Sequence, residues 1–126
     1  MPLIGNRGKK LDILIKRGAT FAPHLVHMLG KVSQEPIDLT GAVIRAGIRK
    51  DQASASFFPL TCGIADALQG YFTFSMSKEV TAAIPYLGPH YLPENQYEWD
   101  LEIEFSSGFV MPVFYGNVKI VSEITQ

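Results

Sequence analysis

The sequence has a single cysteine, Cys62, and this scarcity excludes two kinds of site. One thiol cannot form a disulfide within the chain, and it cannot complete a zinc site built from cysteines. No apolar run approaches the ~20 residues that a membrane-spanning helix needs, and residues 1–18 are too often interrupted by charge for a signal peptide. We therefore expect a protein that is made and folded in the cytoplasm, with no membrane partner.

The chain also lacks an excess of charge of either sign. It has 11 basic and 12 acidic residues, which give a net charge of −1. Binding through the phosphates of a nucleic acid relies on many lysines and arginines, so we expect no nucleic acid partner. With 126 residues, 47% of them apolar, the chain suffices for one core. We expect one domain over residues 1–126, with residues 1–9 as a flexible N-terminal arm.

Alternation of apolar and polar residues dominates the sequence and predicts β-strands. From Tyr97 to Phe105 every odd position is apolar and every even position is acidic, which is the period of a strand with one buried face. Residues 42–50 alternate in the same way, with Arg45 and Arg49 on the outer face. Shorter or weaker strand patterns occur at residues 11–17, 21–29, 56–61, 70–77 and 109–124.

Turn and helix signals separate these strands. Residues 106–108 predict a hairpin, and in the last strand Gly116 is expected to mark a bulge or bend. One short helix is expected near residues 78–84, because Ser77 is a good N-cap and Pro85 ends the segment. The pattern predicts an all-β fold: an Ig-like antiparallel β-sandwich of about seven strands with one connector helix.

The stretch Asp38-Leu39-Thr40-Gly41 invites comparison with the catalytic loop of acid proteases. That chemistry needs two carboxylates that share a proton, each in an Asp-Thr/Ser-Gly loop. Here a leucine interrupts the motif, and the sequence has no second copy. A structural corner is the better interpretation: Asp38 can cap its own turn, Thr40 can bond the backbone, and Gly41 can take a positive φ.

Other residues with chemical potential are scattered. His24 and His27 are three apart, so on a strand they face opposite sides, and His90 is distant in the sequence. Cys62 has no catalytic histidine marked by a motif, and the sequence contains no phosphate loop or nucleophile elbow. We therefore predict no enzyme activity, no metal and no cofactor.

The basic face of the strand at 42–50 and the acidic face of the strand at 97–105 have opposite charges and could pair with each other. If the strands are neighbours, Arg45 and Arg49 can pair with Glu98, Asp100 and Glu102 and help to fix the register. A solvated or partner-facing surface is the alternative. Ca²⁺ is disfavoured, because alternate residues of a strand stand roughly 6.6 Å apart and cannot converge on one ion.

The proline-rich segment 85–96 carries the candidate interface. Tyr86, Leu87, Tyr91 and Leu92 are large side chains on a stiff loop, and rigid aromatic loops often anchor protein interfaces. The alternative is that this loop closes over an open end of the sandwich and completes its core.

Three segments, in their order, resemble a family of small phage and prophage tail or baseplate proteins, similar to the N-terminal domain of phage upper baseplate proteins. They are PIDLTGAVIRAGIRK at 36–50, GYFTFSMSKEVTAAI at 70–84 and YEWDLEIEFSSGFVMPVFYGNVKIVSEIT at 97–125. The segment 85–96 is longer than the compact link expected in that family. The resemblance implies an Ig-like β-sandwich with a structural role and with no catalytic residues.

The resemblance further implies other tail or baseplate proteins and copies of the chain itself as partners. It implies assembly in the host cytoplasm and a final place in the tail of the virion. The alternative function is a carbohydrate- or receptor-binding module that uses Trp99, Tyr86 or Tyr91 as a stacking platform. The strand period argues against Trp99 in that role, because it places the indole on the core face.

Overall fold

The computed structural model describes residues 8–50, 57–85 and 97–121, and these residues form strands and one short helix. The elements in chain order are β1 (Lys9–Lys10), β2 (Ile13–Lys16), β3 (Phe21–His27), β4 (Val43–Arg49), β5 (Phe58–Pro59), β6 (Thr61–Asp66), β7 (Tyr71–Met76), α1 (Lys78–Ala83), β8 (Tyr97–Glu104) and β9 (Val110–Val121). The predicted all-β fold is confirmed.

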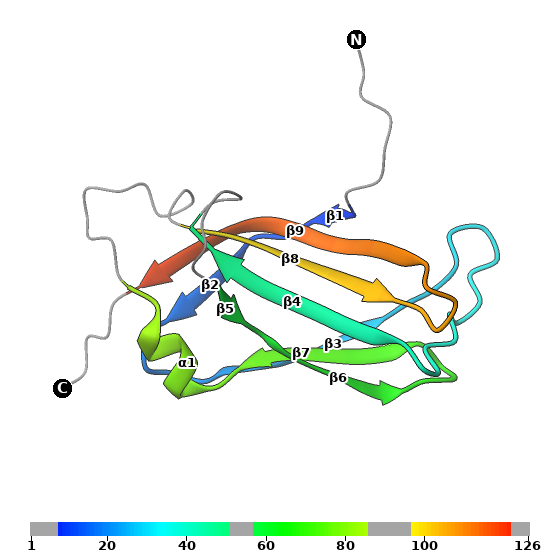
Figure 1. Cartoon of the computed structure of the whole chain (residues 1–126), viewed down its shortest axis with the longest axis horizontal. Coiled ribbons are helices and arrows are strands. Elements are labelled where there is room, and N and C mark those ends of the chain that lie inside the picture. Colours follow the sequence, from blue (N-terminus) through cyan, green and yellow to red (C-terminus); the bar gives the residue numbers. More distant parts are fainter. Residues whose placement is uncertain (1–7, 51–56, 86–96, 122–126) are drawn as a thin grey trace, which may run out of the picture.

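The strands form two sheets (Figure 1). The six-stranded sheet has the order β1-β9-β8-β4-β5, with β2 also paired to β9, and the three-stranded sheet has the order β3-β7-β6. Neighbours are antiparallel except β1 and β2, which run parallel to β9. In immunoglobulin terms, β3-β7-β6 corresponds to strands B-E-D, and β9-β8-β4 corresponds to G-F-C. The predicted Ig-like sandwich is therefore present.

Three of the observed strands, β5, β6 and β1, differ from the expected ones. The strand expected at 56–61 is short β5, and the chain then crosses to the other sheet at Leu60, whose N–H donates to the carbonyl of Ala46 at 3.0 Å. It continues as β6, most of which the sequence pattern missed. Lys9 belongs to β1, so the expected N-terminal arm over residues 1–9 is wrong at that end. Residues 1–7 lie outside the described ranges.

The alternating strands supply one core between the sheets. Tyr97, Trp99, Leu101 and Ile103 of β8 are buried, as their period predicted. The Trp99 ring lies 5.4 Å from the ring of Phe74 in the opposite sheet, measured between centroids. Its indole Nε1–H donates to the carbonyl oxygen of Leu11 at 2.6 Å. The single tryptophan thus links both sheets and the segment between β1 and β2.

Glycine is required at position 116 because the segment between β1 and β2 packs against it, and not because of a bulge. The backbone of Leu11 lies so close to Gly116 that a Cβ there would overlap the Leu11 carbonyl. The N–H of Leu11 donates to the carbonyl of Tyr115 at 2.8 Å, which fixes this approach. The bulge lies three residues earlier, because Leu101 pairs with Phe114 and the next residue of β8 pairs with Pro112, which leaves Val113 unmatched.

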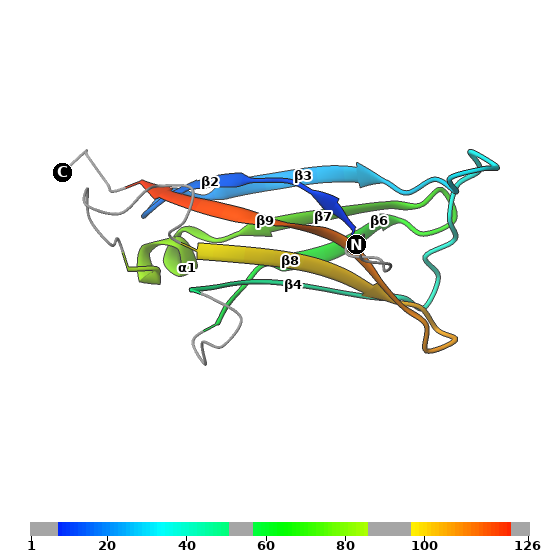
Figure 2. The same cartoon turned by 90° about the horizontal axis from the view of Figure 1, so that it is seen from above.

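The helix α1 is a connector at the end of the sandwich opposite the β8–β9 hairpin (Figures 1 and 2). Ser77 is its N-cap, and its hydroxyl accepts the N–H of Val80 at 3.4 Å, as predicted. Thr81 is fully buried, and its hydroxyl donates to the carbonyl of Ala19 at 2.9 Å. The helix is thereby attached to the turn between β2 and β3.

We predict that Gly116→Ala destabilises the protein, because the added methyl group would collide with the Leu11 backbone. Overpacking of this kind costs about 1–3 kcal/mol. The control is Lys119→Ala at an exposed position of the same strand, where the substitution adds no atoms to a packed contact. Urea unfolding should show a lower midpoint for the first variant and no loss for the second. Equal midpoints for Gly116→Ala and the native sequence would refute the close approach.

Candidate functional site

The Asp38-Leu39-Thr40-Gly41 stretch is a capped corner that precedes β4. The Asp38 carboxylate accepts the backbone N–H of Thr40 at 2.9 Å and the Thr40 hydroxyl at 2.6 Å. The turn cap is therefore confirmed, although Thr40 bonds the carboxylate rather than the backbone. Gly41 has a φ of 75°, which an L side chain rarely adopts. The hydroxyl and then the amide of Thr40 lower the pKa of Asp38 below its ordinary value.

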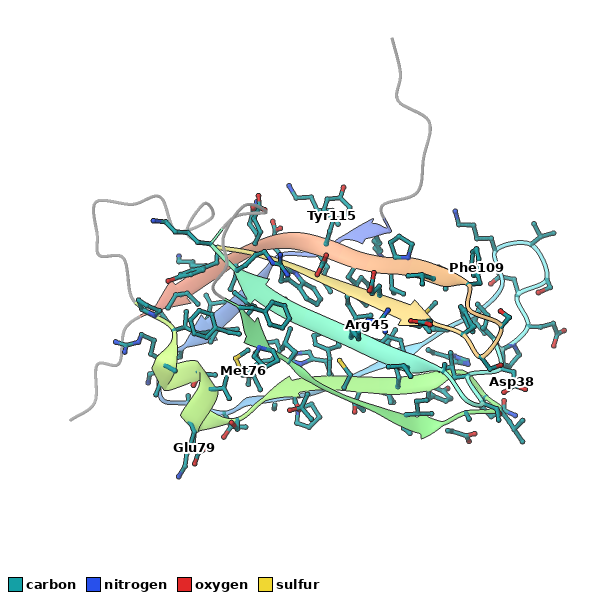
Figure 3. All side chains as sticks on the ribbon, in the orientation of Figure 1. Asp38, Arg45, Met76, Glu79, Phe109 and Tyr115 are labelled. Carbon is teal, nitrogen blue, oxygen red and sulfur yellow. The ribbon has the colours of Figure 1, made fainter. Side chains whose placement is uncertain are left out.

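The leucine that interrupts the protease motif holds this corner on the core. Leu39 is fully buried, and its N–H donates to the carbonyl of Ala67 in the β6–β7 turn at 2.9 Å. The carboxylate of Asp38 accepts its hydrogen bonds from Thr40 within its own turn, at the end of the molecule where Figure 3 labels Asp38. The capped turn at Asp38, the buried Leu39 and the positive φ of Gly41 together form a structural corner.

The two charged strand faces meet on the outer side of the six-stranded sheet, where Figure 3 labels Arg45. In the register of β4 and β8, Arg45 lies opposite Glu102 and Arg49 lies opposite Glu98. The guanidinium of Arg45 contacts the carboxylates of Glu102 and Glu104, each at 3.0 Å. These two hydrogen-bonded carboxylates raise the pKa of Arg45. All three side chains of these ion pairs are solvent-accessible, so the pairs favour the register more than they stabilise the fold.

Arg49 makes a ring contact that the sequence did not suggest, besides lying opposite Glu98 in the register. The guanidinium carbon of Arg49 lies 5.2 Å from the ring centroid of Phe57. Asp100 lies opposite Gly47 in β4 and Tyr115 in β9. The Phe57 ring covers Gly47, where a Cβ would collide with it.

A groove of about 550 Å³ runs over this outer face. Its lining residues include Lys10 of β1, Arg49 of β4, Glu98 and Asp100 of β8, and Asn117 of β9. Charges of both signs and an amide make it suited to a polar ligand rather than an apolar one. Among the described residues that line it there is no histidine, serine or cysteine, so these residues offer no nucleophile paired with a base.

His24 and His27 stack on aromatic rings, and Cys62 is partly buried. His27 stacks on Tyr71 with 4.0 Å between ring centroids, whereas His24 stacks on Phe74, which is on the other face of β7. His90 lies outside the described ranges. Over residues 8–50, 57–85 and 97–121, no three His, Cys, Asp or Glu side chains come together as a metal site would need. Burial raises the pKa of the Cys62 thiol to about 11, so the reactive thiolate is scarce at neutral pH.

The predicted interface residues Tyr86, Leu87, Tyr91 and Leu92 all lie outside the described residues. The structure instead shows exposed apolar side chains at the opposite end of the sandwich from α1 (Figures 1 and 3). We call this set the apolar end; its members are Leu29, Val32, Val43, Leu68, Phe109 and Val110. They come from the β3–β4 connection, the start of β4, the β6–β7 turn and the β8–β9 hairpin.

The exposure at the apolar end is extensive. Val32 is 97% exposed, and Phe109 is 63% exposed although its ring stacks on Phe105 at 6.2 Å. Sequence reasoning missed this set because its members have no common period. The available signal was the presence of large apolar residues beside turn residues, as in the segment Ser-Ser-Gly-Phe-Val at 106–110.

Comparison with models of known protein families gives no match to this chain. Comparison with curated proteins gives no match either. In the part of the chain that the structure describes, no helix has the length and apolar character to cross a membrane.

We predict that Thr40→Val raises the pKa of Asp38, because it removes the hydroxyl that contributes most to lowering it. A carboxyl whose pKa is depressed by folding stabilises the protein above its unfolded pKa, and that stability is lost as the pH falls through the folded pKa. Thr40→Val should therefore destabilise the protein at pH 7 and do so much less at pH 2. NMR titration of Asp38 and urea unfolding at both pH values measure this.

Asp38→Asn is the control for the Thr40 prediction. It keeps an oxygen that can accept both hydrogen bonds but cannot titrate, so adding Thr40→Val to it should give a pH-independent loss of stability. An unchanged Asp38 titration in the Thr40→Val variant would contradict the role of the hydroxyl.

Proposed function

We propose that this protein is a non-enzymatic structural component of a phage or prophage tail or baseplate. It acts by association with other tail proteins and with copies of itself, and it is assembled in the host cytoplasm before it becomes part of the virion. The segments at 36–50, 70–84 and 97–125, taken in this order along the sequence, resemble such proteins, and the Ig-like sandwich is the fold that this resemblance implies.

The apolar end is the observation that carries the association. Large apolar side chains that gather on a soluble protein outside its core mark sites of interaction. Here they project from three separate connections at one end, which correspond to the B–C, D–E and F–G loops of an immunoglobulin domain. Phe109 offers an exposed aromatic ring of the kind that anchors protein interfaces.

The remaining candidate residues support a structural role. Asp38 is held by the amide and hydroxyl of Thr40, and the Cys62 thiol is protonated at neutral pH because burial raises its pKa to about 11. The acidic face of β8 pairs in part with Arg45. Each of these groups is used to build or orient the sandwich.

A second candidate function is binding of a glycan in the groove on the six-stranded sheet. Its carboxylates and the Asn117 amide match the hydroxyl groups of sugars, and the exposed ring of Phe57 lies beside Arg49 near Gly47. Trp99 cannot serve as the stacking platform, because it is buried. Glycan-array binding that is abolished by Asn117→Ala would favour this function over the assembly role.

We predict that the protein co-purifies with a tail protein encoded by a neighbouring gene, and that Phe109→Ser with Leu68→Ser weakens this complex at least tenfold. The reason is the loss of two exposed anchors from the apolar end. Leu25→Ser is the matched control, because Leu25 is 63% exposed, like Phe109, but lies on β3.

Affinities measured by calorimetry or biolayer interferometry decide between the outcomes. Equal binding by the double variant and the native protein would reject the apolar end as the interface. The absence of tail genes in the neighbourhood, together with no complex with any neighbouring product, would reject the assembly function itself.

A further inference from the structure

One glycine has no explanation within its own chain. The other described glycines either have a positive φ or sit against atoms that a Cβ would strike, as Gly47 does with Phe57 and Gly116 does with Leu11. Gly63 has neither: its φ is not positive, and the nearest atom to a Cβ would be the Thr73 hydroxyl at 3.7 Å. Glycine inside a strand weakens it, and it often marks a place where another backbone approaches closely.

Gly63 lies in the middle of an edge strand. In the order β3-β7-β6, strand β6 has a neighbour on one side, so half of its backbone N–H and C=O groups face away from the sheet. From Thr61 to Ile64 it pairs with β7 without a register shift, which leaves a regular template of extended backbone. The irregularity comes after Ile64, between it and Asp66.

The other described edges are shorter or carry features that discourage strand addition. Strand β2 has four residues and ends in Lys16, and the part of β4 that does not pair with β5 carries Arg45. Strand β3 contains Pro23 and has an irregular register between Phe21 and His24. Strand β5 has only two residues, one of them Pro59, and β1 consists of two lysines. Residues 61–65 of β6, Thr-Cys-Gly-Ile-Ala, contain neither proline nor charge. Natural edges without such protection are sites of pairing.

Ile64 adds a second sign of a missing neighbour. It pairs with Phe72, whose side chain is fully buried, so Ile64 is on the core-facing side of its sheet. Ile64 is nevertheless 40% exposed, because the three-stranded sheet ends there. A further strand beside β6 would cover this side chain and extend the core.

We propose that β6 pairs antiparallel with β6 of a second copy of this chain, about a two-fold axis at Gly63. This deepens the proposed function, on which it rests, by naming the surface of self-association. In this register Gly63 faces its counterpart, Cys62 faces Ile64, and Thr61 faces Ala65, so every opposed pair is uncharged. Where the opposed residues are a non-hydrogen-bonded pair, the two Cα atoms come within about 4.5 Å, which glycine accommodates best.

The charge pattern favours a second copy as the occupant. Asp66 of each copy lies beyond the paired residues and faces Leu60, so the two carboxylates are at opposite ends of the ladder. The paired stretch has no charge that would attract a charged peptide strand, and pairing with its own copy opposes no like charges. The result is one continuous sheet of six strands, three from each copy.

Two charge variants of the full chain test the axis. Gly63→Lys places two lysines directly opposite each other and should weaken the dimer by roughly fivefold or more, as expected for opposed like charges. Thr61→Lys adds the same charge on the same strand face, but the two lysines are then four residues apart along the ladder, so the dimer should weaken by less than about twofold. Sedimentation equilibrium gives both dissociation constants.

Cross-linking tests the register independently of any effect of the lysines on folding. In a Cys62→Ser background, Gly63→Cys places two thiols opposite each other, whereas Thr61→Cys keeps them well beyond the ~7 Å limit for a disulfide between Cα atoms. Mild oxidation should give a linked dimer of the first variant and not of the second. Equal cross-linking of both would reject the axis at Gly63, and a native chain that stays monomeric with no cross-link would reject the pairing.

The outcome is separable from that of the proposed function. Loss of the dimer in Gly63→Lys with retained binding to the tail partner would leave the assembly role intact. A dimer that persists in the Phe109→Ser and Leu68→Ser variant, with no tail partner bound by any form, would support the pairing and reject the assembly role.

Discussion

The contact on which the rest of the structure depends is the approach of Leu11 to Gly116. The Leu11 carbonyl accepts the indole N–H of Trp99 at 2.6 Å, and no side chain at 116 stands in the way. Asp12 continues the attachment, since its carboxylate accepts the N–H of Asn117 at 2.9 Å. These bonds fix β1 and β2 along β9, and so they cover the edge of the six-stranded sheet that a long strand would otherwise expose.

This closure decides where the protein can be extended. One edge of the six-stranded sheet carries β1 and β2, and the other ends in the two-residue β5. Because the chain leaves β5 at Leu60 and enters the opposite sheet, β6 becomes the outermost strand there. The same crossing that completes the sandwich therefore creates the longest described edge that has neither proline nor charge.

The sequence predicted the strands correctly where one face of a strand is buried and the other is exposed to solvent. The period of β8 predicted the burial of Trp99 and the outer position of Glu102. Glu102 forms an ion pair with Arg45, which lies opposite it on β4. The cap of Asp38 on Thr40 was also predictable, because an Asx turn is formed within three residues. Local chemistry and strict alternation are both visible in a single sequence.

Sequence-based prediction failed where the role of a residue depends on contacts with residues that are distant in the sequence. The sequence predicts a bulge or bend at Gly116 because glycine in a strand often marks one, and it does not show that the Leu11 backbone passes over this residue. Most of β6 was missed because an edge strand is exposed on both faces and has no alternation to detect. The apolar end was missed for a similar reason: Val32, Leu68 and Phe109 are far apart in the sequence, and only the fold places their connections at the same end of the sandwich.

The two proposed surfaces are compatible in one assembly. Strand β6 runs toward the apolar end, where the β6–β7 turn carries Leu68 (Figure 1). Antiparallel pairing about an axis at Gly63 reverses the direction of the second copy, so the two apolar ends point in opposite directions. Neither end covers the other, and the pair consumes both β6 edges, so growth through that edge stops at two copies. Such a dimer would present two identical docking ends, as a protein that connects two parts of a larger structure requires.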